Sequence, residues 1–344
     1  MMVGRLWAGR PFWTKKLGQM GRLVLESHAR PMTGVAGRPG RVEEGETGVM
    51  FLGHSSFLLQ MATGAKVLDG GTNVLIDPVF ATRLVLLRRQ RRAGVRVGDL
   101  PGIDVVLVTH AHMDHLNRPT LRQVARATRR KTGEAPVVVV PRGVEDLVAG
   151  LGFREIRVLD WWEETTVAGL TVTMTPAKHW GARMFTDTHR QFGGYVVADE
   201  AGGRVYHSGD TAYFDGFAEI GRRLRPLIAL MPIGAYFPDS YRAVHTSPEE
   251  ALRGALEVGA QVMVPMHFGT FRLGREPIEE PPVRLMAEAR RLGVENRVRV
   301  LLEGETMVVA MGKRATFEGV AHQRKHGKFG HKKRNEDVEA GRRS

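Results

Sequence analysis

The sequence predicts a single α/β domain. Three observations indicate it: short apolar runs that suit strands recur along residues 48–312, segments with helical spacing lie between them, and no linker interrupts this stretch. Of the 344 residues, 42% are hydrophobic and 25% are charged, which is typical of a globular chain. A core of this size needs no disulfides, and none can form because cysteine is absent.

The predicted strands are apolar runs bounded by turn residues. In order along the chain they occupy residues 49–52, 57–59, 73–76, 105–108, 137–140, 169–175, 195–198, 205–206, 227–231 and 262–265. The first two flank a Gly53-His54-Ser55-Ser56 turn and predict a hairpin or a bent strand, and Pro78 ends the third because proline cannot continue the pairing. The continuous runs at 105–108 and 137–140 suit strands buried on both faces.

Helices are expected between and after these strands. Residues 119–131 place apolar side chains three to four positions apart, after Asn117 and Pro119, which are common at helix starts. Two more helices are expected at residues 249–258 and 283–292. Residues 83–96 hold six arginines without clear periodicity and predict an exposed loop or a short basic helix.

Positive charge is concentrated at the two ends of the chain. The net charge is +13, of which residues 1–42 contribute +7 and residues 313–344 contribute +6, so the part between them is neutral. We therefore expect a folded domain at 48–312, a flexible or peripheral segment at 1–47 and a disordered tail at 313–344.

The location of the protein is predicted from apolar runs and from the first twenty residues. No apolar run is long enough to span a bilayer and no secretory signal is evident, so we expect a cytoplasmic protein. Aromatic and basic residues among the first twenty also suit contact with an anionic lipid surface, at the inner face of the membrane.

Four potential metal ligands lie within six residues, directly after the strand expected at 105–108. They are His110, His112, Asp114 and His115. In extended backbone His110 and His112 leave on one face, and a turn near Met113 can bring Asp114 and His115 to a second metal. A loop without function would crowd three imidazoles beside a carboxylate with no evident partner. The spacing predicts a metal site of imidazole and carboxylate ligands.

Three later segments complete a family pattern. They are Thr175-Pro176-Ala177-Lys178-His179-Trp180, Tyr206-His207-Ser208-Gly209-Asp210-Thr211 and Val264-Pro265-Met266-His267-Phe268-Gly269-Thr270. In this order behind the cluster, they resemble the metallo-β-lactamase superfamily. The resemblance is tightest to the enzymes similar to N-acylphosphatidylethanolamine-hydrolysing phospholipase D and covers roughly residues 48–310. Further landmarks of that family are Phe51-Leu52-Gly53-His54-Ser55, Ile76-Asp77-Pro78-Val79-Phe80, Pro232-Ile233-Gly234-Ala235-Tyr236 and His245-Thr246-Ser247-Pro248-Glu249-Glu250-Ala251.

The resemblance implies a four-layer αββα sandwich, in which two mixed sheets lie face to face with helices outside. It implies a metal pair whose ligands are His110, His112 and His179 on one ion, Asp114, His115 and His267 on the other, and Asp210 between them. It favours two zinc ions, although manganese and iron also accept nitrogen and oxygen ligands. Water held by such an ion ionises near pH 7, and the hydroxide would be the nucleophile.

Catalytic roles are expected for Asp114, Asp210 and His245. His245 would protonate the leaving group or contact phosphate, and its alternative is a histidine at a helix start. His54 is expected either to donate a hydrogen bond to a ligand or to be a structural residue of the core. Asp77 is expected either to orient a ligand histidine or to be a turn residue before Pro78. His207 is expected to be structural.

The expected activity is that of a phosphodiesterase acting on a small-molecule or phospholipid-like substrate. A lactonase or acyl-ester hydrolase of the same superfamily is the alternative, because the same hydroxide would attack a carbonyl. A nuclease or nucleic-acid binder is disfavoured, since residues 116–178 are too short for the added domain that nucleases of the superfamily commonly carry. A homodimer stays open.

Overall fold

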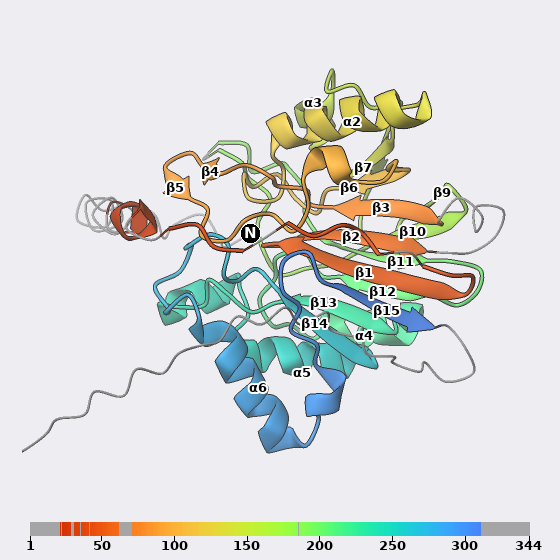
Figure 1. Cartoon of the computed structure of the whole chain (residues 1–344). Coiled ribbons are helices and arrows are strands. Elements are labelled where there is room, and N and C mark those ends of the chain that lie inside the picture. The colour runs from red at the N-terminus through yellow and green to blue at the C-terminus, as the bar shows by residue number, and fades with distance from the viewer. Residues whose placement is uncertain are drawn as a thin grey trace, which may run out of the picture.

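The computed structural model describes residues 21, 23–28, 31–34, 36–40, 42–61, 71–184 and 186–310. Two sheets pack face to face, and helices cover the outer face of each (Figure 1). This is the four-layer αββα sandwich that the resemblance implied, so the fold prediction is confirmed. Among the described residues, none of the helices combines the length and the apolar character that crossing a membrane requires.

The first sheet has seven strands in the order β15-β1-β2-β3-β6-β7-β8. Their bounds are β1 Glu46–Gly53, β2 Ser56–Met61, β3 Thr72–Ile76, β6 Val105–Leu107, β7 Val137–Pro141, β8 Glu155–Leu159 and β15 Thr306–Ala310. Alternate side chains of a strand face opposite sides of a sheet. Val49 and Phe51 of β1 therefore enter the core between the sheets, whereas Met50 and Leu52 join the cluster under the outer helices.

The second sheet has six strands in the order β14-β13-β12-β11-β10-β9. Their bounds are β9 Glu164–Val167, β10 Leu170–Thr175, β11 Gly194–Ala198, β12 Arg204–His207, β13 Ile228–Pro232 and β14 Val262–Met266. Neighbours β12, β13 and β14 run parallel, and β9 to β12 alternate in direction. The sheet is mixed, like the first one, in which β3, β6, β7 and β8 run parallel.

The helices form the two outer layers. Over the first sheet lie α2 (Arg118–Thr132) and α3 (Glu145–Val148), and over the second lie α4 (Gly216–Leu224), α5 (Pro248–Val258) and α6 (Glu280–Leu292) (Figure 1). Short 3-10 helices are η2 Val97–Asp99, η3 Asp239–Ala243 and η4 Glu295–Arg297. Helix α5 begins with a capping box, in which Ser247 and Glu250 each bond the other's backbone N–H.

All of the strands and helices predicted from the sequence are present, with ends displaced by at most three residues. The prediction missed β8 and β9 because both have mostly exposed or half-exposed side chains and therefore little apolar signal. It also missed α3, α4 and β15. In α4, Gly216 and Gly221 interrupt the helical pattern.

Residues 83–96 correct the sequence prediction in part. They contain a short hairpin, β4 (Arg83–Leu84) and β5 (Leu87–Arg88), and no helix. The segment is not wholly exposed either, because Arg89 is buried. Its guanidinium donates to the carbonyl oxygens of Arg91 at 2.7 Å, Val79 at 2.8 Å and Leu52 at 3.2 Å. Backbone carbonyl groups of β1 and of two loop residues thus provide the acceptors that a buried guanidinium needs.

The described part of the N-terminal segment lies against the domain. Leu23 packs in a cluster with Phe271, and Thr33 pairs with Arg91. Strand β1 begins at Glu46, two residues before the predicted domain boundary. Residues 1–20 and 311–344 lie outside the described residues, so the expectations of a flexible N-terminal end and a disordered tail stay predictions.

Candidate metal centre

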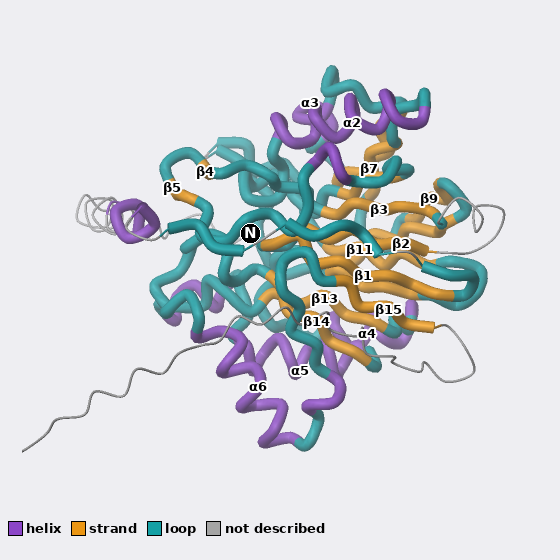
Figure 2. The backbone as a smooth tube through the Cα atoms, viewed as in Figure 1, coloured by secondary structure: helices purple, strands orange, loops and turns teal. Residues whose placement is uncertain are grey.

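Loops gather at one edge of the sandwich (Figure 2). The carboxyl ends of five strands supply the candidate ligands: His54 follows β1, residues 110–115 follow β6, His179 follows β10, Asp210 follows β12 and His267 follows β14. His54 and His267 have left-handed backbones, with φ of 60° and 61°, and the His267 N–H donates to the His54 carbonyl at 2.8 Å. This contact joins the two sheets beside the site.

His110, His112 and His179 form one group of potential ligands. Nε2 of His110 and Nε2 of His179 lie 2.9 and 3.2 Å from Nδ1 of His112. Oδ2 of Asp210 lies 4.0 Å from Nε2 of His110 and 3.9 Å from Nε2 of His179. Four donor atoms from three separate segments therefore converge, as a tetrahedral metal site requires.

Asp114, His115 and His267 form the second group, which also includes His54. Nε2 of His115 and Nε2 of His267 lie 3.6 and 3.5 Å from Oδ2 of Asp114. Nε2 of His115 also lies 3.3 Å from Oδ1 of Asp210, and Nε2 of His267 lies 3.0 Å from Oδ2 of Asp210. Asp210 thus contacts both groups, which is the place of the predicted bridge. The structure brings all seven predicted ligands together.

Asp77 orients two of these histidines from behind. Its Oδ2 accepts from His115 Nδ1 at 2.6 Å and from the Thr109 hydroxyl at 2.6 Å, and its Oδ1 accepts from the Thr109 N–H at 2.8 Å. The Thr109 hydroxyl in turn accepts from His110 Nδ1 at 2.9 Å. These contacts assign the Nδ1–H tautomer to both rings and leave each Nε2 free for a metal. They favour the orienting interpretation of Asp77 over a turn residue.

The Val244 carbonyl orients a third ligand, His179. Burial keeps the histidines of the first group neutral. Nδ1 of His179 lies 2.8 Å from the Val244 carbonyl, to which it donates, so Nε2 faces the site. Burial lowers the pKa of His110 and of His179 well below the ordinary value. Neutral imidazole is the form that binds metal ions.

Carboxylates raise the pKa of His115 and of His267 in the second group, whereas burial lowers the pKa of His54 to about 4. Burial opposes the charge on His267, but Asp210 and Asp114 outweigh it and raise the pKa of His267 to about 9. Burial is likewise outweighed at His115, where Asp210, Asp77 and Asp114 raise the pKa well above its usual value. Protonated imidazoles therefore balance the carboxylates here in the absence of metal, and bound cations would take over that role.

Three further histidines surround the ligands. Nε2 of His54 lies 2.9 Å from Oδ2 of Asp114, so His54 contacts a candidate ligand. Nε2 of His207 donates to the Ser55 carbonyl at 2.9 Å, and its Nδ1 accepts from the Gly209 N–H at 3.1 Å, as a structural residue would. His245 lies in the site itself.

The donor atoms present fit a pair of cations. Several are buried and have no hydrogen-bond partner among the described residues, namely Nε2 of His115, Nε2 of His267, Oδ1 of Asp210 and Nδ1 of His245. Leaving buried polar atoms unpaired costs free energy, and native proteins do so rarely. All four are nitrogen or carboxylate oxygen atoms, which zinc and other divalent transition metals accept as ligands.

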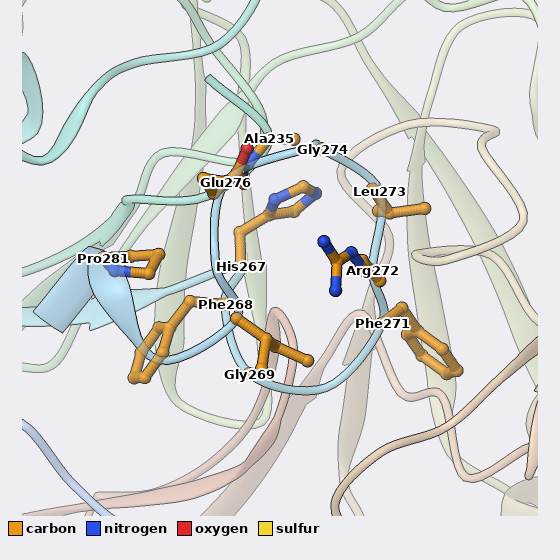
Figure 3. Close-up of a pocket in the computed structure, with 11 residues that line it drawn as sticks. Ala235, His267, Phe268, Gly269, Phe271, Arg272, Leu273, Gly274, Glu276 and Pro281 are labelled. Carbon is orange, nitrogen blue, oxygen red and sulfur yellow. Dashed lines mark hydrogen bonds between the residues drawn. The ribbon is translucent and has the colours of Figure 1, made fainter. Parts of the chain in front are cut away.

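The loop after β14 lines a pocket beside His267. Figure 3 shows the side chains of His267 and Arg272 pointing into the space that this loop encloses. Glu276 accepts from the Ala235 N–H at 2.6 Å, and Arg272 pairs with Glu26 at 3.0 Å. The loop is thus anchored to neighbouring segments at two points.

Three residues beside the ligands had no predicted role, namely Thr109, Trp180 and Arg183, although Trp180 belongs to the family segment that ends in His179-Trp180. The Trp180 ring centroid lies 4.5 Å from that of His179, and its place beside a predicted ligand was an available signal. Thr109 also adjoins a predicted ligand, but its bridge from His110 to Asp77 depends on a second strand. No sequence pattern indicated Arg183, because its contacts are with Ala111 and Leu116, which are about seventy residues away in the sequence.

Comparisons with known proteins agree with the fold. Residues 72–268 match the family described as "Beta-lactamase superfamily domain". A UPF0173 metal-dependent hydrolase of Rubrobacter xylanophilus is 33% identical over 267 residues, which cover 76% of this chain and 97% of that protein.

Other similar proteins are longer than this chain or more distant in sequence. An uncharacterized protein of Mycobacterium tuberculosis is 34% identical over 70% of this chain, which spans 63% of that protein's length. N-acyl-phosphatidylethanolamine-hydrolyzing phospholipase D 1 of Caenorhabditis elegans is 31% identical over 65% of this chain and 64% of its own. Igni18, a metallo hydrolase of Ignicoccus hospitalis, superposes with a TM-score of 0.57 at 25% identity and covers 76% of this chain and 98% of its own.

Proposed function

Because the chain belongs to the metallo-β-lactamase superfamily, we propose that it is a metal-dependent hydrolase that uses two divalent cations. The observation that carries the proposal is the convergence of five imidazoles and two carboxylates, among which Nε2 of His115, Nε2 of His267 and Oδ1 of Asp210 are buried without a hydrogen-bond partner among the described residues. We propose zinc as the metal, since all candidate ligand atoms are nitrogen or oxygen and zinc is commonly bound by four such atoms. Manganese and iron remain compatible with these ligand types.

The residues would divide the work between two positions. His110, His112 and His179 would hold one cation, Asp114, His115 and His267 the other, and Asp210 would contact both. Two cations would supply a nucleophile from water near neutral pH and would neutralise negative charge on substrate oxygens. Asp77 and Thr109 keep the ligand nitrogens aimed at the centre, so that little reorganisation is needed on binding.

We propose a phosphodiester as the substrate. The similarity to the phospholipase D of Caenorhabditis elegans supports this class, because the name of that enzyme describes hydrolysis of a phosphodiester in a lipid. Cations flanked by ligands of low net charge favour an anionic substrate. A phospholipid-like molecule or a smaller diester both satisfy this chemistry.

His245 is proposed to bind a substrate oxygen. Its Nδ1 lies buried, 3.8 Å from Oδ2 of Asp210 and without a hydrogen-bond partner among the described residues. Burial lowers the pKa of His245 to about 4, so the ring is neutral at pH 7. A neutral imidazole donates a hydrogen bond well but is a poor source of a proton. We therefore prefer the contact role to protonation of the leaving group.

A lactonase or acyl-ester hydrolase is the second candidate, because the same ligand set also serves attack on a carbonyl. The relative from Rubrobacter xylanophilus supports hydrolysis without specifying the bond. Nucleic acid stays a disfavoured substrate. The predicted cytoplasmic location, the contact of basic ends with an anionic membrane and a homodimer also stay predictions.

Metal analysis and a substrate panel test the proposal. Purified full-length protein is expected to hold close to two equivalents of zinc and to hydrolyse bis-p-nitrophenyl phosphate or an N-acylphosphatidylethanolamine faster than a set of lactones. His267→Ala should lose at least half of the metal and nearly all activity, whereas His189→Ala, at an exposed histidine, should keep both. A single bound iron would contradict the proposed pair of zinc ions. Faster hydrolysis of lactones than of the diesters would contradict the proposed phosphodiester substrate.

A further inference from the structure

A large aromatic side chain lies exposed against the candidate ligands. Trp180, in the loop between β10 and β11, keeps 44% of its surface exposed. Its ring centroid lies 4.5 Å from that of His179, 4.8 Å from that of His112 and 6.3 Å from that of His245. An indole that stays half open to water at this position retains apolar surface that a bound molecule can cover.

A guanidinium group follows three residues later on the same loop. Nη1 of Arg183 donates to the carbonyl oxygens of Ala111 at 2.7 Å and Leu116 at 2.9 Å, at the two ends of the turn that carries three of the ligands. Burial lowers the pKa of Arg183, and the neighbouring cations Arg118 and Arg190 lower it further. Asp187 and Asp114 raise its pKa in the opposite direction, so the group is a half-buried cation with both cations and carboxylates in its surroundings.

Arg183 has no carboxylate within ion-pair distance in the part of the chain that the structure describes. Asp187 of the same loop bonds Arg190 instead, at 2.6 Å. The two carbonyl contacts use Nη1 alone, and Nε and Nη2 have no described partner. A partly buried cation is costly unless an anion or further acceptors compensate it.

We propose that Trp180 and Arg183 form a substrate subsite for an organic anion. A planar or apolar group of the ligand would lie on the indole, and an anionic group separate from the scissile bond would contact the free nitrogens of the guanidinium. The fork of Arg183 suits a carboxylate, phosphate or sulfonate with two oxygens in one plane. Trp180 contacts His112, and Arg183 contacts both ends of the same turn, so both residues lie beside the segment that carries three of the candidate ligands.

The subsite rests on the proposed function, and it narrows the substrate class. The best substrates would carry an apolar group and a second negative charge in the part of the molecule next to the reacting bond. Neutral esters and small anions would each fill only half of the subsite.

Binding of simple probes to the metal-loaded full-length protein tests the subsite without turnover. The probes are 2-naphthalenesulfonate, which has both groups, methanesulfonate, which has only the charge, and 2-naphthol, which has only the ring. Titration calorimetry is expected to show at least roughly tenfold tighter binding of 2-naphthalenesulfonate than of either partial probe, because a charge-assisted contact and a ring contact each contribute about that much.

Substitutions separate the two contacts. Trp180→Ala should weaken both naphthyl probes about tenfold and leave methanesulfonate unchanged, whereas Arg183→Gln should weaken both sulfonates and leave 2-naphthol unchanged. Trp180→Phe and Arg183→Lys should restore most of the affinity, which a purely structural role of these residues would not predict. Trp161→Ala is the matched control, since Trp161 is 41% exposed and its described ring contact is with Phe192.

Several outcomes would overturn the subsite. They are equal binding of the three probes, equal loss of all three in a variant that keeps its metal, or an effect of Trp161→Ala as large as that of Trp180→Ala. The binding assay is independent of the hydrolysis assay with the substrate panel. A wild-type protein that binds the naphthyl anion but hydrolyses no ester would therefore refute the proposed function alone. Hydrolysis without the preference for the naphthyl anion would refute the subsite alone.

Discussion

Replacement of Asp77 by asparagine should weaken binding of the second cation while leaving the fold intact. The Asp77 carboxylate is buried and accepts three hydrogen bonds, from the Thr109 N–H, the Thr109 hydroxyl and His115 Nδ1. An amide of the same shape can keep its oxygen toward the Thr109 N–H, but its NH₂ group then faces Nδ1–H of His115. Two donors face each other, so the imidazole must turn or move its proton to Nε2.

The size of this effect follows from the role of Nε2 as the ligand atom. Loss of such an orienting partner lowers metal affinity by about 10- to 100-fold, or about 1.4 to 2.8 kcal/mol. The cation near His110 should be less affected, because His110 reaches Asp77 only through the Thr109 hydroxyl. Competition with a chromophoric chelator at pH 7.5 should thus show one cation that binds nearly as in the wild type and one that binds weakly.

A matched control separates orientation from general damage. Asp199→Asn changes another buried aspartate, whose Oδ1 accepts from the Gly203 N–H at 2.7 Å in a turn away from the ligands. It should bind both cations as the wild type does. Wild-type affinity of Asp77→Asn for two cations would contradict the orienting role of Asp77. An equal loss of affinity in Asp77→Asn and Asp199→Asn would contradict it as well.

Three further predictions concern pH and stability. Cation affinity should rise with pH through about pH 9, because His267 and His115 must each lose a proton; in the metal-free protein the charge on His267 stabilises the fold fully below about pH 6.5, this contribution is lost as the pH rises through about 9, and calorimetry in buffers of different ionisation enthalpy would detect the released protons. Arg89→Met should lower the free energy of unfolding by about 3 to 5 kcal/mol in urea, since three carbonyls lose their buried donor and Glu303 loses a neighbouring positive charge, whereas exposed Arg126→Met should change it by less than about 0.5 kcal/mol. Ser247→Ala should cost about 1 kcal/mol by removing the cap of α5, and an unchanged melting temperature would count against that role.

Local sequence patterns identified most of the sandwich before any contact was known. Continuous apolar runs such as 105–108 predict strands because a strand buried on both faces leaves no position for polar side chains. The edge strands β8 and β9 escaped notice for the opposite reason, since each exposes side chains to solvent. The hairpin at residues 83–88 was also missed, because its short strands are held by Leu23 and Phe271, which are remote in sequence.

The candidate ligands divide in a similar way. His110 to His115 could be predicted from spacing, because alternate residues of extended backbone such as His110 and His112 leave on one face and a turn can bring Asp114 and His115 beside them. His179, Asp210 and His267 were found through the order of family motifs, and their approach to the cluster required the structure. The choice between two roles for Asp77 likewise required the His115 and Thr109 contacts.

The amino-acid sequence by itself determined the fold class and the kind of chemistry available at the site. Residue types set which ligands exist, and local periodicity sets which strand end carries them. Only the tertiary structure decided which nitrogen of each histidine faces the centre, which donor atoms stay buried without partners, and which side chains stand beside them. These properties depend on hydrogen bonds and burial between segments sixty or more residues apart, such as His54 with Asp114 or His110 with Asp210, and local spacing cannot predict such contacts.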